Sequence, residues 1–77
     1  MKVPRGVPGD RLLALVHFGY EVIRQKGSHV RLRHSGPPAH LITVPLHGAL
    51  KTGTLQGIAA EVAQMRSITV ESIYELL

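Results

Sequence analysis

The sequence predicts an α+β fold in which a three-stranded antiparallel sheet carries helices on one of its faces. Apolar residues recur at helical spacing near the N-terminus and again from residue 54 onward. Between these regions, residues 20–45 contain three short segments of strand character, separated by loops that contain glycine or proline. A chain of 77 residues has room for one core. We therefore expect a single domain over residues 1–77, in the order helix, three strands, helix and short helix.

The first helix is predicted in the segment PGDRLLALVHFGY, residues 8–20. Asp10 is expected to cap its N-terminus and to suit the positive end of the helix dipole. Gly19 is expected to end the helix in the left-handed conformation. Four residues are expected on the inner face, with His17 on the flank: Leu12, Leu13, Val16 and Tyr20.

The next two segments, YEVIRQ at 20–25 and SHVRLRH at 28–34, are predicted to form a β-hairpin joined at Lys26-Gly27. Gly27 can adopt the positive φ that a tight hairpin needs. Because strand side chains alternate, Val30 and Leu32 should point to one face of the sheet. The opposite face should then hold three residues together: His29, Arg31 and Arg33.

A loop, SGPPAH, follows the hairpin, since consecutive prolines cannot continue a ladder. The segment HLITVP at 40–45 is the third predicted strand, and the loop LHGALKTG follows it. Short connections favour an antiparallel meander with the helices on one face. The other face would stay open, lined by the row that contains His29.

Two helices are predicted after residue 50. In TLQGIAAEVAQM, residues 54–65, one apolar stripe should form part of the core: Leu55, Ile58, Val62 and Met65, with Ala59 and Ala63 beside it. Thr52 or Thr54 could cap this helix, and Gly53 would allow a close backbone approach. The segment TVESIYELL, residues 69–77, should form a short helix capped by Thr69, with three residues inward: Val70, Ile73 and Leu77.

The charge is uneven along the chain. The formal net charge is +4, and the first 50 residues contain seven Lys and Arg against Asp10 and Glu21, which gives +5 for that part. A basic half on a small domain suggests a polyanionic partner, most often a nucleic acid. The chain has no cysteine, and its longest strongly apolar run, residues 12–16, is too short to cross a bilayer. We therefore expect a cytoplasmic protein.

Several kinds of site are disfavoured by spacing. The five histidines, at positions 17, 29, 34, 40 and 47, show neither HExxH nor zinc-finger spacing, so no metal site is expected. There is no G-x-S-x-G elbow and no phosphate-binding loop of the GxxxxGK[ST] type. Gly53-Thr54 at a helix start either holds a phosphate on free N–H groups or is an ordinary helix start.

What remains is a histidine among cations. Imidazole can accept or donate a proton near neutral pH, and the like charges of Lys26, Arg31 and Arg33 favour its neutral form at His29. The same cations can bind phosphate and stabilise negative charge in a transition state. Because RNA supplies its own nucleophile, the 2′-hydroxyl, a base and nearby cations suffice for transesterification to a cyclic phosphate without a metal. The proton donor to the leaving oxygen stays open between Lys26 and water.

At KGSHVRLRH, followed by LITVPLHGALKTGTLQGIAAEV, the chain resembles the HicA (YcfA-like) family of mRNA interferase toxins. Four features appear in the family's order: the first helix ending in Gly19-Tyr20, the Lys-Gly-Ser-His turn, the Thr-Val-Pro strand end and the Gly-Thr-Leu helix start. Many relatives have a basic residue after Gly-Thr-Leu, whereas this chain has Gln56 and Gly57. Val30 stands where a second histidine often follows the motif histidine, and strand alternation would turn it inward.

The resemblance implies a HicA-like toxin domain with a double-stranded-RNA-binding-domain-like α-β-β-β-α fold. It also implies an endoribonuclease of a type II toxin-antitoxin system that cuts mRNA with His29 as the catalytic residue and that a HicB-like antitoxin neutralises. No cofactor is implied. We expect six further residues to contact RNA: Arg24, Lys26, Gly27, Ser28, Arg31 and Arg33.

Two alternatives stay open at this point. The same face could belong to a non-catalytic RNA-binding module that recognises RNA by shape. It could instead belong to a protein-interaction domain whose basic face meets an acidic partner.

Overall fold

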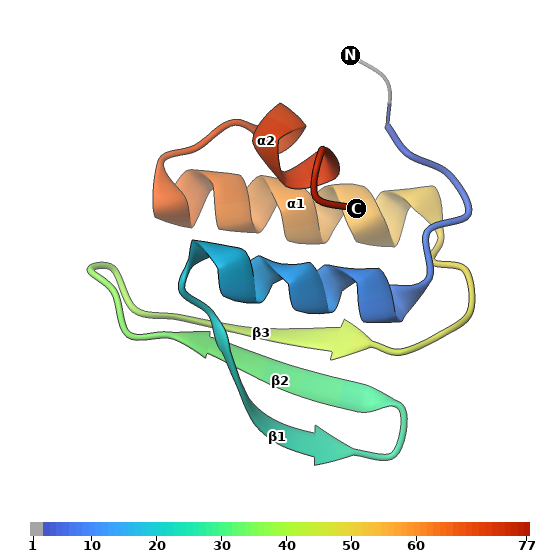
Figure 1. The fold of residues 1–77 in the computed structure, drawn as a ribbon, viewed down its shortest axis with the longest axis horizontal. Coiled ribbons are helices and arrows are strands. Elements are labelled where there is room, and N and C mark those ends of the chain that lie inside the picture. Colours follow the sequence, from blue (N-terminus) through green and yellow to red (C-terminus); the bar gives the residue numbers. More distant parts are fainter. Residues whose placement is uncertain (1–2) are drawn as a thin grey trace.

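The chain folds into two layers, a sheet and the helices that cover one face of it (Figure 1). A computed structural model describes residues 3–77. The elements follow in the order η1 (Gly9–Phe18), β1 (Glu21–Lys26), β2 (His29–His34), β3 (His40–Pro45), α1 (Thr52–Arg66) and α2 (Val70–Tyr74). The predicted α+β class and the predicted order are confirmed.

The first helix, η1, is a 3₁₀-helix, and this changes its inner face. With three residues per turn, side chains three positions apart stack above one another. Leu12 and Leu15 are therefore the buried pair, while the side chain of Val16 is 50% exposed. The prediction that Val16 faces inward is wrong because it assumed the 3.6-residue period of an α-helix. Tyr20, just after the helix, is buried as predicted.

The prediction for the C-terminal end of η1 is confirmed, and the prediction for its N-terminal cap is wrong. Gly19 has φ 94° and closes the helix, as predicted. At the N-terminus the cap position belongs to Pro8, and no side chain caps the helix. The prediction that Asp10 is the cap is wrong, since Asp10 lies inside the first turn, where its charge still suits the helix dipole.

The sheet is an antiparallel meander in the order β1-β2-β3. The hairpin turn is Gly27-Ser28, with Lys26 paired to His29 and Gly27 at φ 57°. The positive φ of Gly27 is confirmed, and the turn lies one residue later than predicted. Along β2 and β3, exposed and buried residues alternate, so one face of these strands lies under the helices and the other is open. Every residue of the edge strand β1 is exposed.

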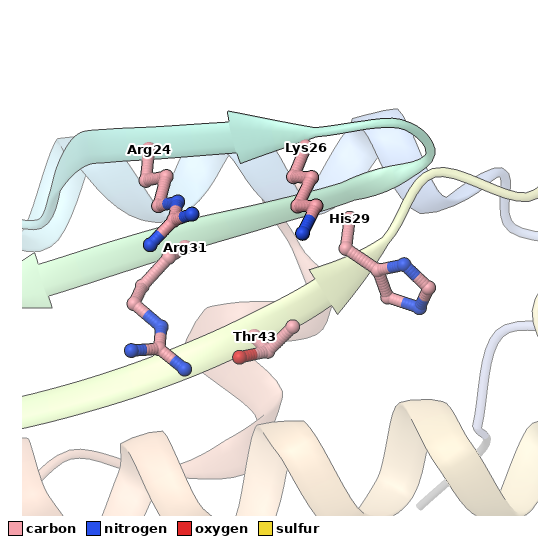
Figure 2. Close-up of a pocket in the computed structure, with 5 residues that line it drawn as sticks. All are labelled: Arg24, Lys26, His29, Arg31 and Thr43. Carbon is pink, nitrogen blue, oxygen red and sulfur yellow. The ribbon is translucent and has the colours of Figure 1, made fainter.

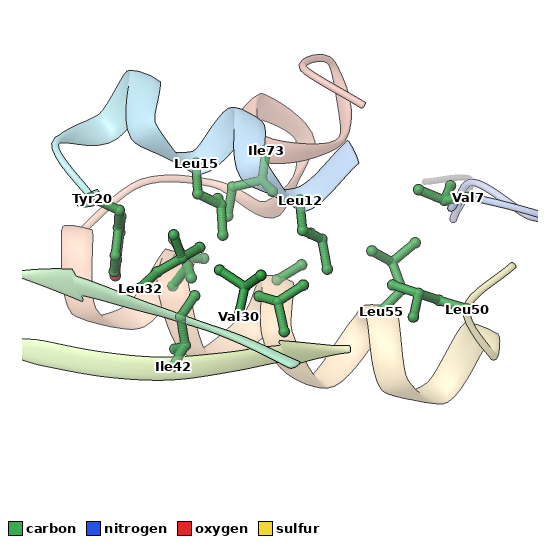
Figure 3. Packing of buried hydrophobic residues seen from close by; sticks show 14 residues of the cluster. Val7, Leu12, Leu15, Tyr20, Val30, Leu32, Ile42, Leu50, Leu55 and Ile73 are labelled. Carbon is green, nitrogen blue, oxygen red and sulfur yellow. The ribbon is translucent and has the colours of Figure 1, made fainter. Parts of the chain in front are cut away.

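The core lies between the helices and the inner face of β2 and β3 (Figure 3). It joins residues from every helix and from two of the three strands, among them Leu12, Leu15, Val30, Leu32, Ile42, Val44, Leu55, Val62 and Ile73; β1 contributes none. Burial of these apolar side chains is the main term that holds the helices on the sheet. Because the helices occupy one face, the alternate residues of β2 and β3 on the other face are exposed.

The two C-terminal helices begin differently. α1 begins at Thr52 with Lys51 in the cap position and no side-chain cap, so the predicted caps Thr52 and Thr54 are wrong. A capping side chain must precede the first helical residue, and both threonines lie within the first turn. No atom lies near the place of a Cβ on Gly53, so the predicted close approach is absent there.

α2 begins as predicted: the hydroxyl oxygen of Thr69 accepts a hydrogen bond from the backbone N–H of Ser72 at 3.2 Å. Ile73 is buried, and Val70 and Leu77 are partly buried against the core.

The buried face of α1 consists of Leu55, Ala59, Val62 and Ala63. Ile58 is partly buried against the core, and Met65 is half-buried. The predicted stripe therefore faces the core, but the two alanines are more deeply buried than Ile58 and Met65. None of the helices within residues 3–77 is long and apolar enough to span a membrane.

Candidate functional site

The first residue of β2, His29, lies on the open face of the sheet. Its side chain is exposed, whereas the next residue, Val30, is buried beneath the helices. Arg31 and Arg33 follow at alternate positions and are exposed as well. The face predicted for His29 from strand alternation is confirmed.

A shallow hollow of about 280 Å³ opens beside His29 on this face. It is lined by Arg24, Lys26, His29, Arg31 and Thr43 (Figure 2). The strand register explains why these five meet. Lys26 pairs with His29, and Arg31 lies between Arg24 on one side and Thr43 on the other. Cross-strand neighbours on one face are close enough to act together.

The hollow is strongly electropositive. Three of its five lining residues are cations, the others offer an imidazole and a hydroxyl group, and none is a carboxylate. Within residues 3–77, neither Arg24 nor Lys26 nor Arg31 forms an ion pair. Unpaired guanidinium and ammonium groups around a concave surface attract anions and hydrogen-bond well to phosphate oxygens.

Three other residues predicted to contact RNA do not line the hollow: Gly27, Ser28 and Arg33. Arg33 is on the open face but lies farther along β2, paired with Glu21 and Leu41, and does not line the hollow. Gly27 and Ser28 form the turn. The carbonyl of Ser28 accepts a hydrogen bond from the N–H of Leu46 at 2.6 Å. These two residues therefore shape the backbone that presents His29.

Two residues that the sequence reasoning did not select lie at the site. Thr43 lines the hollow, and the ring of His47 lies 6.2 Å from the ring of His29 between centroids. Counting the β2–β3 register from the pair His34 and His40 would have placed Pro45 opposite His29. His47 follows two residues later, so this count could have found it.

A second hollow of about 440 Å³ lies on the other side of His29. Its lining residues are His29, Pro45, His47, Ala49, Leu50, Lys51 and Thr54. Thr54 of the Gly53-Thr54 pair therefore faces the same region as His29, while Gly53 does not line this hollow.

Two other histidines, His40 and His17, line neither hollow. His40 is buried, with its two ring nitrogens bonded to the hydroxyl of Tyr20 and to a carboxylate oxygen of Glu61. His17 is exposed on η1, as predicted. Over residues 3–77, no three His, Cys, Asp or Glu side chains are grouped so that they could hold a metal ion.

A family model described as "HicA toxin of bacterial toxin-antitoxin" matches residues 10–65, which is more than half of the chain. The matched range includes most of η1, the whole sheet, the residues that line both hollows and most of α1. No curated protein and no solved structure matches the chain.

Proposed function

The chain belongs to the HicA toxin family, and from this membership we propose that it is an mRNA interferase. In this proposal it is the toxin of a type II toxin-antitoxin system and cuts RNA in the cytoplasm without a metal ion or cofactor. His29 is the catalytic base. Lys26, Arg31 and Arg24 hold the phosphate backbone at the scissile bond, and Arg33 contacts RNA farther along the same face.

One observation carries the proposal: the exposed imidazole of His29 lies at the edge of a hollow with three cations that form no ion pair among residues 3–77. A base that must reach a 2′-hydroxyl has to be accessible, because the RNA backbone is too bulky to enter a core. The cations must lie within reach of the same phosphate, because charge grows on its oxygens as the reaction proceeds. The exposure of His29 and the cations that line the adjacent hollow support both conditions.

The reaction proceeds in one displacement. A ring nitrogen of His29 takes the proton of the 2′-hydroxyl, and the 2′-oxygen forms a bond to the adjacent phosphorus. The bond from phosphorus to the 5′-oxygen of the next nucleotide breaks, and that oxygen takes up a proton. The products are a 2′,3′-cyclic phosphate and a 5′-hydroxyl end. The guanidinium of Arg31 and the ammonium of Lys26 stabilise the negative phosphoryl oxygens.

A toxin of this kind needs an antitoxin, and we propose a HicB-like protein that covers the open face. Acidic side chains of such a partner would pair with Arg24, Lys26 and Arg31 and exclude RNA by charge and by contact. Leu41, which is 53% exposed on β3, offers an apolar contact on the same face.

The direct test is to incubate the purified protein with RNA in EDTA and to analyse the new ends. We expect fragments with 2′,3′-cyclic phosphate and 5′-hydroxyl ends. His29→Ala should lower the cleavage rate by at least about 10²–10⁴-fold, the usual contribution of a positioned acid or base, and should abolish growth arrest on expression. His17→Ala is the matched control, because that histidine is exposed but lies on η1.

The outcomes separate the alternatives. RNA that is bound in a salt-sensitive manner yet stays intact would identify a binding module and overturn the proposal. Full cleavage by His29→Ala would remove His29 from the mechanism. RNA affinity of that variant close to wild type, with cleavage lost, is the result that supports a catalytic rather than a binding role.

A further inference from the structure

His47, in the loop between β3 and α1, is close to His29 and has no part in the function proposed above. The two rings lie 6.2 Å apart between centroids and meet edge to face, with an angle of 71° between their planes. Both residues are exposed, and both line the second hollow. An edge-to-face contact between exposed rings does little for stability, so the fold does not explain this pair.

The backbone holds the two histidines in a defined relation. The N–H of Leu46 donates to the carbonyl of Ser28 at 2.6 Å, which ties the residue before His47 to the residue before His29. On the other side, the carbonyl of His47 accepts from the N–H of Gly9 at 2.7 Å. The loop that bears His47 is therefore bonded both to the hairpin turn and to the start of η1.

Gly9 makes this junction possible. A Cβ on Gly9 would lie 1.8 Å from the carbonyl oxygen of Pro45, so no other residue fits there without moving the chain. Gly9 is also buried. The position of His47 beside His29 is thus set by backbone packing and hydrogen bonds, and a catalytic group needs such support to be held in place.

We propose that His47 is a second catalytic residue, the acid that protonates the leaving 5′-oxygen. This rests on the proposed function. The separation of 6.2 Å between ring centroids is about twice the hydrogen-bond reach of about 2.6–3.2 Å that a proton transfer requires. A phosphodiester that lies across the exposed edges of the two rings, rather than between them, can then have its 2′-oxygen near one ring and its 5′-oxygen near the other.

The protons and bonds balance in this scheme. His29 gains the proton of the 2′-hydroxyl as the bond from the 2′-oxygen to phosphorus forms. His47, initially protonated, gives its proton to the 5′-oxygen as the bond between that oxygen and phosphorus breaks. Both rings are open to solvent and return to their starting forms by exchange with water. Imidazole suits this role better than an ammonium group because it ordinarily titrates near neutral pH.

The test uses two forms of one oligoribonucleotide that contains the site cut by the wild-type protein. One has the natural 5′-oxygen at that site, and the other has sulfur in its place, which leaves as a thiolate without needing a proton. On the oxygen form, His47→Ala and His47→Gln should each be slower than wild type by about 10²–10⁴-fold. On the sulfur form, both should approach the wild-type rate, while His29→Ala should stay slow on both.

The pH profile adds an independent readout. Cleavage by the wild-type protein should show a bell-shaped dependence, and His47→Ala should lose the fall at high pH that reflects loss of the acid. His17→Ala should match wild type in every assay.

A variant at His47 that is equally slow on both substrates, or as fast as wild type on the oxygen form, overturns the assignment of the acid while the ribonuclease proposal stands. If the wild-type protein cuts neither RNA nor the sulfur form, the proposed function itself fails.

Discussion

Two histidines lie near each end of the paired strands β2 and β3, with His47 two residues beyond β3, and the two pairs differ in burial and in hydrogen-bond partners. At the end near the hairpin turn, His29 and His47 are exposed and lie beside cations. At the opposite end, His34 and His40 are paired in the register and have partners on several sides. We refer to these as the open end and the closed end.

The closed end is a hydrogen-bonded network. Nδ1 of His40 lies 2.6 Å from the Tyr20 hydroxyl, and Nε2 lies 2.8 Å from a carboxylate oxygen of Glu61. A neutral ring satisfies both contacts when Tyr20 donates to Nδ1 and Nε2–H donates to Glu61.

The ring of His34 is held in a similar way. Its Nδ1 accepts from the N–H of Gly36 at 2.8 Å and from the guanidinium of Arg66 at 2.5 Å. The centroid of the His34 ring lies 5.1 Å from that of the Tyr20 ring.

The comparison shows how context assigns a role to a histidine. A buried imidazole must have partners, because an unpaired polar group in a core costs free energy. Once it has them, it links elements, as His40 links Tyr20 to α1 through Glu61. An exposed imidazole beside unpaired cations has no such structural use, and its nitrogens stay available to a ligand. We therefore expect the closed end to contribute to stability, and the proposed chemistry is at the open end.

The largest effect that would test this division comes from His40→Ala. Removing the ring leaves the buried hydroxyl of Tyr20 without its partner, and we expect the free energy of unfolding to fall by about 1–3 kcal/mol. For a domain of this size, that corresponds to a fall in Tm of at least about 4–8 °C. Thermal unfolding followed by circular dichroism measures it.

The matched variant at the open end is His29→Ala, which should change the free energy of unfolding by no more than about 0.5 kcal/mol. Cleavage by His40→Ala, measured well below its Tm, should stay close to wild type. Loss of stability in His29→Ala, or loss of activity in folded His40→Ala, would contradict the division into two ends.

A smaller effect is expected for Arg31→Ala. This guanidinium lies in the middle of the hollow beside His29, and its loss should weaken RNA binding several-fold for all sequences alike. The slope of log K against log salt concentration should fall by about 1, since one phosphate contact is lost.

The control for this prediction is Arg11→Ala, because Arg11 is exposed on η1, on the helical side of the sheet. Both variants are made in the His29→Ala protein, which the proposed function predicts not to cut RNA. Binding isotherms at several salt concentrations then measure their effects. Equal losses for Arg31 and Arg11 would indicate that net charge, and not the open face, attracts the RNA.

The smallest predicted effect concerns pH at the closed end. Burial raises the pKa of the Tyr20 phenol above its ordinary value of 10.0. The unfolded chain therefore releases this proton at a lower pH than the folded protein. The resulting stabilisation is complete below about pH 10 and is lost as the pH rises through the folded-state pKa.

Tyr20→Phe has no such proton, so its free energy of unfolding should fall less steeply than that of wild type above about pH 10. Denaturant unfolding at a series of alkaline pH values measures this difference. Parallel curves for the two proteins would show that the phenol is not shielded by the core.

The open face shows which features of the fold can be predicted from local sequence patterns. Strand alternation placed His29 and Arg31 on the face opposite Val30, and the positive φ of Gly27 placed the turn to within one residue. Both depend on backbone geometry over a few residues, which the sequence displays directly. The same is true of the Thr69 cap.

Predictions that depended on longer-range packing were less successful. Because η1 is a 3₁₀-helix rather than an α-helix, Leu15 is buried and Val16 is exposed. The start of α1 was predicted at its threonines, whereas the loop from β3 places Lys51 in the cap position. The spacing of residues within η1 and α1 does not specify how the neighbouring elements pack against them, so neither outcome could be predicted from it.

By itself, the sequence determined the order of the elements, the hairpin and the side of β2 on which its basic residues project. These follow from side-chain period and turn chemistry. Only the tertiary structure decided which histidines would meet. His47 stands beside His29 because of the β2–β3 register and the bonds from Leu46 and Gly9, and His40 is enclosed because Tyr20 and Glu61 pack against it. Such contacts join residues far apart in the chain, and no local period specifies them.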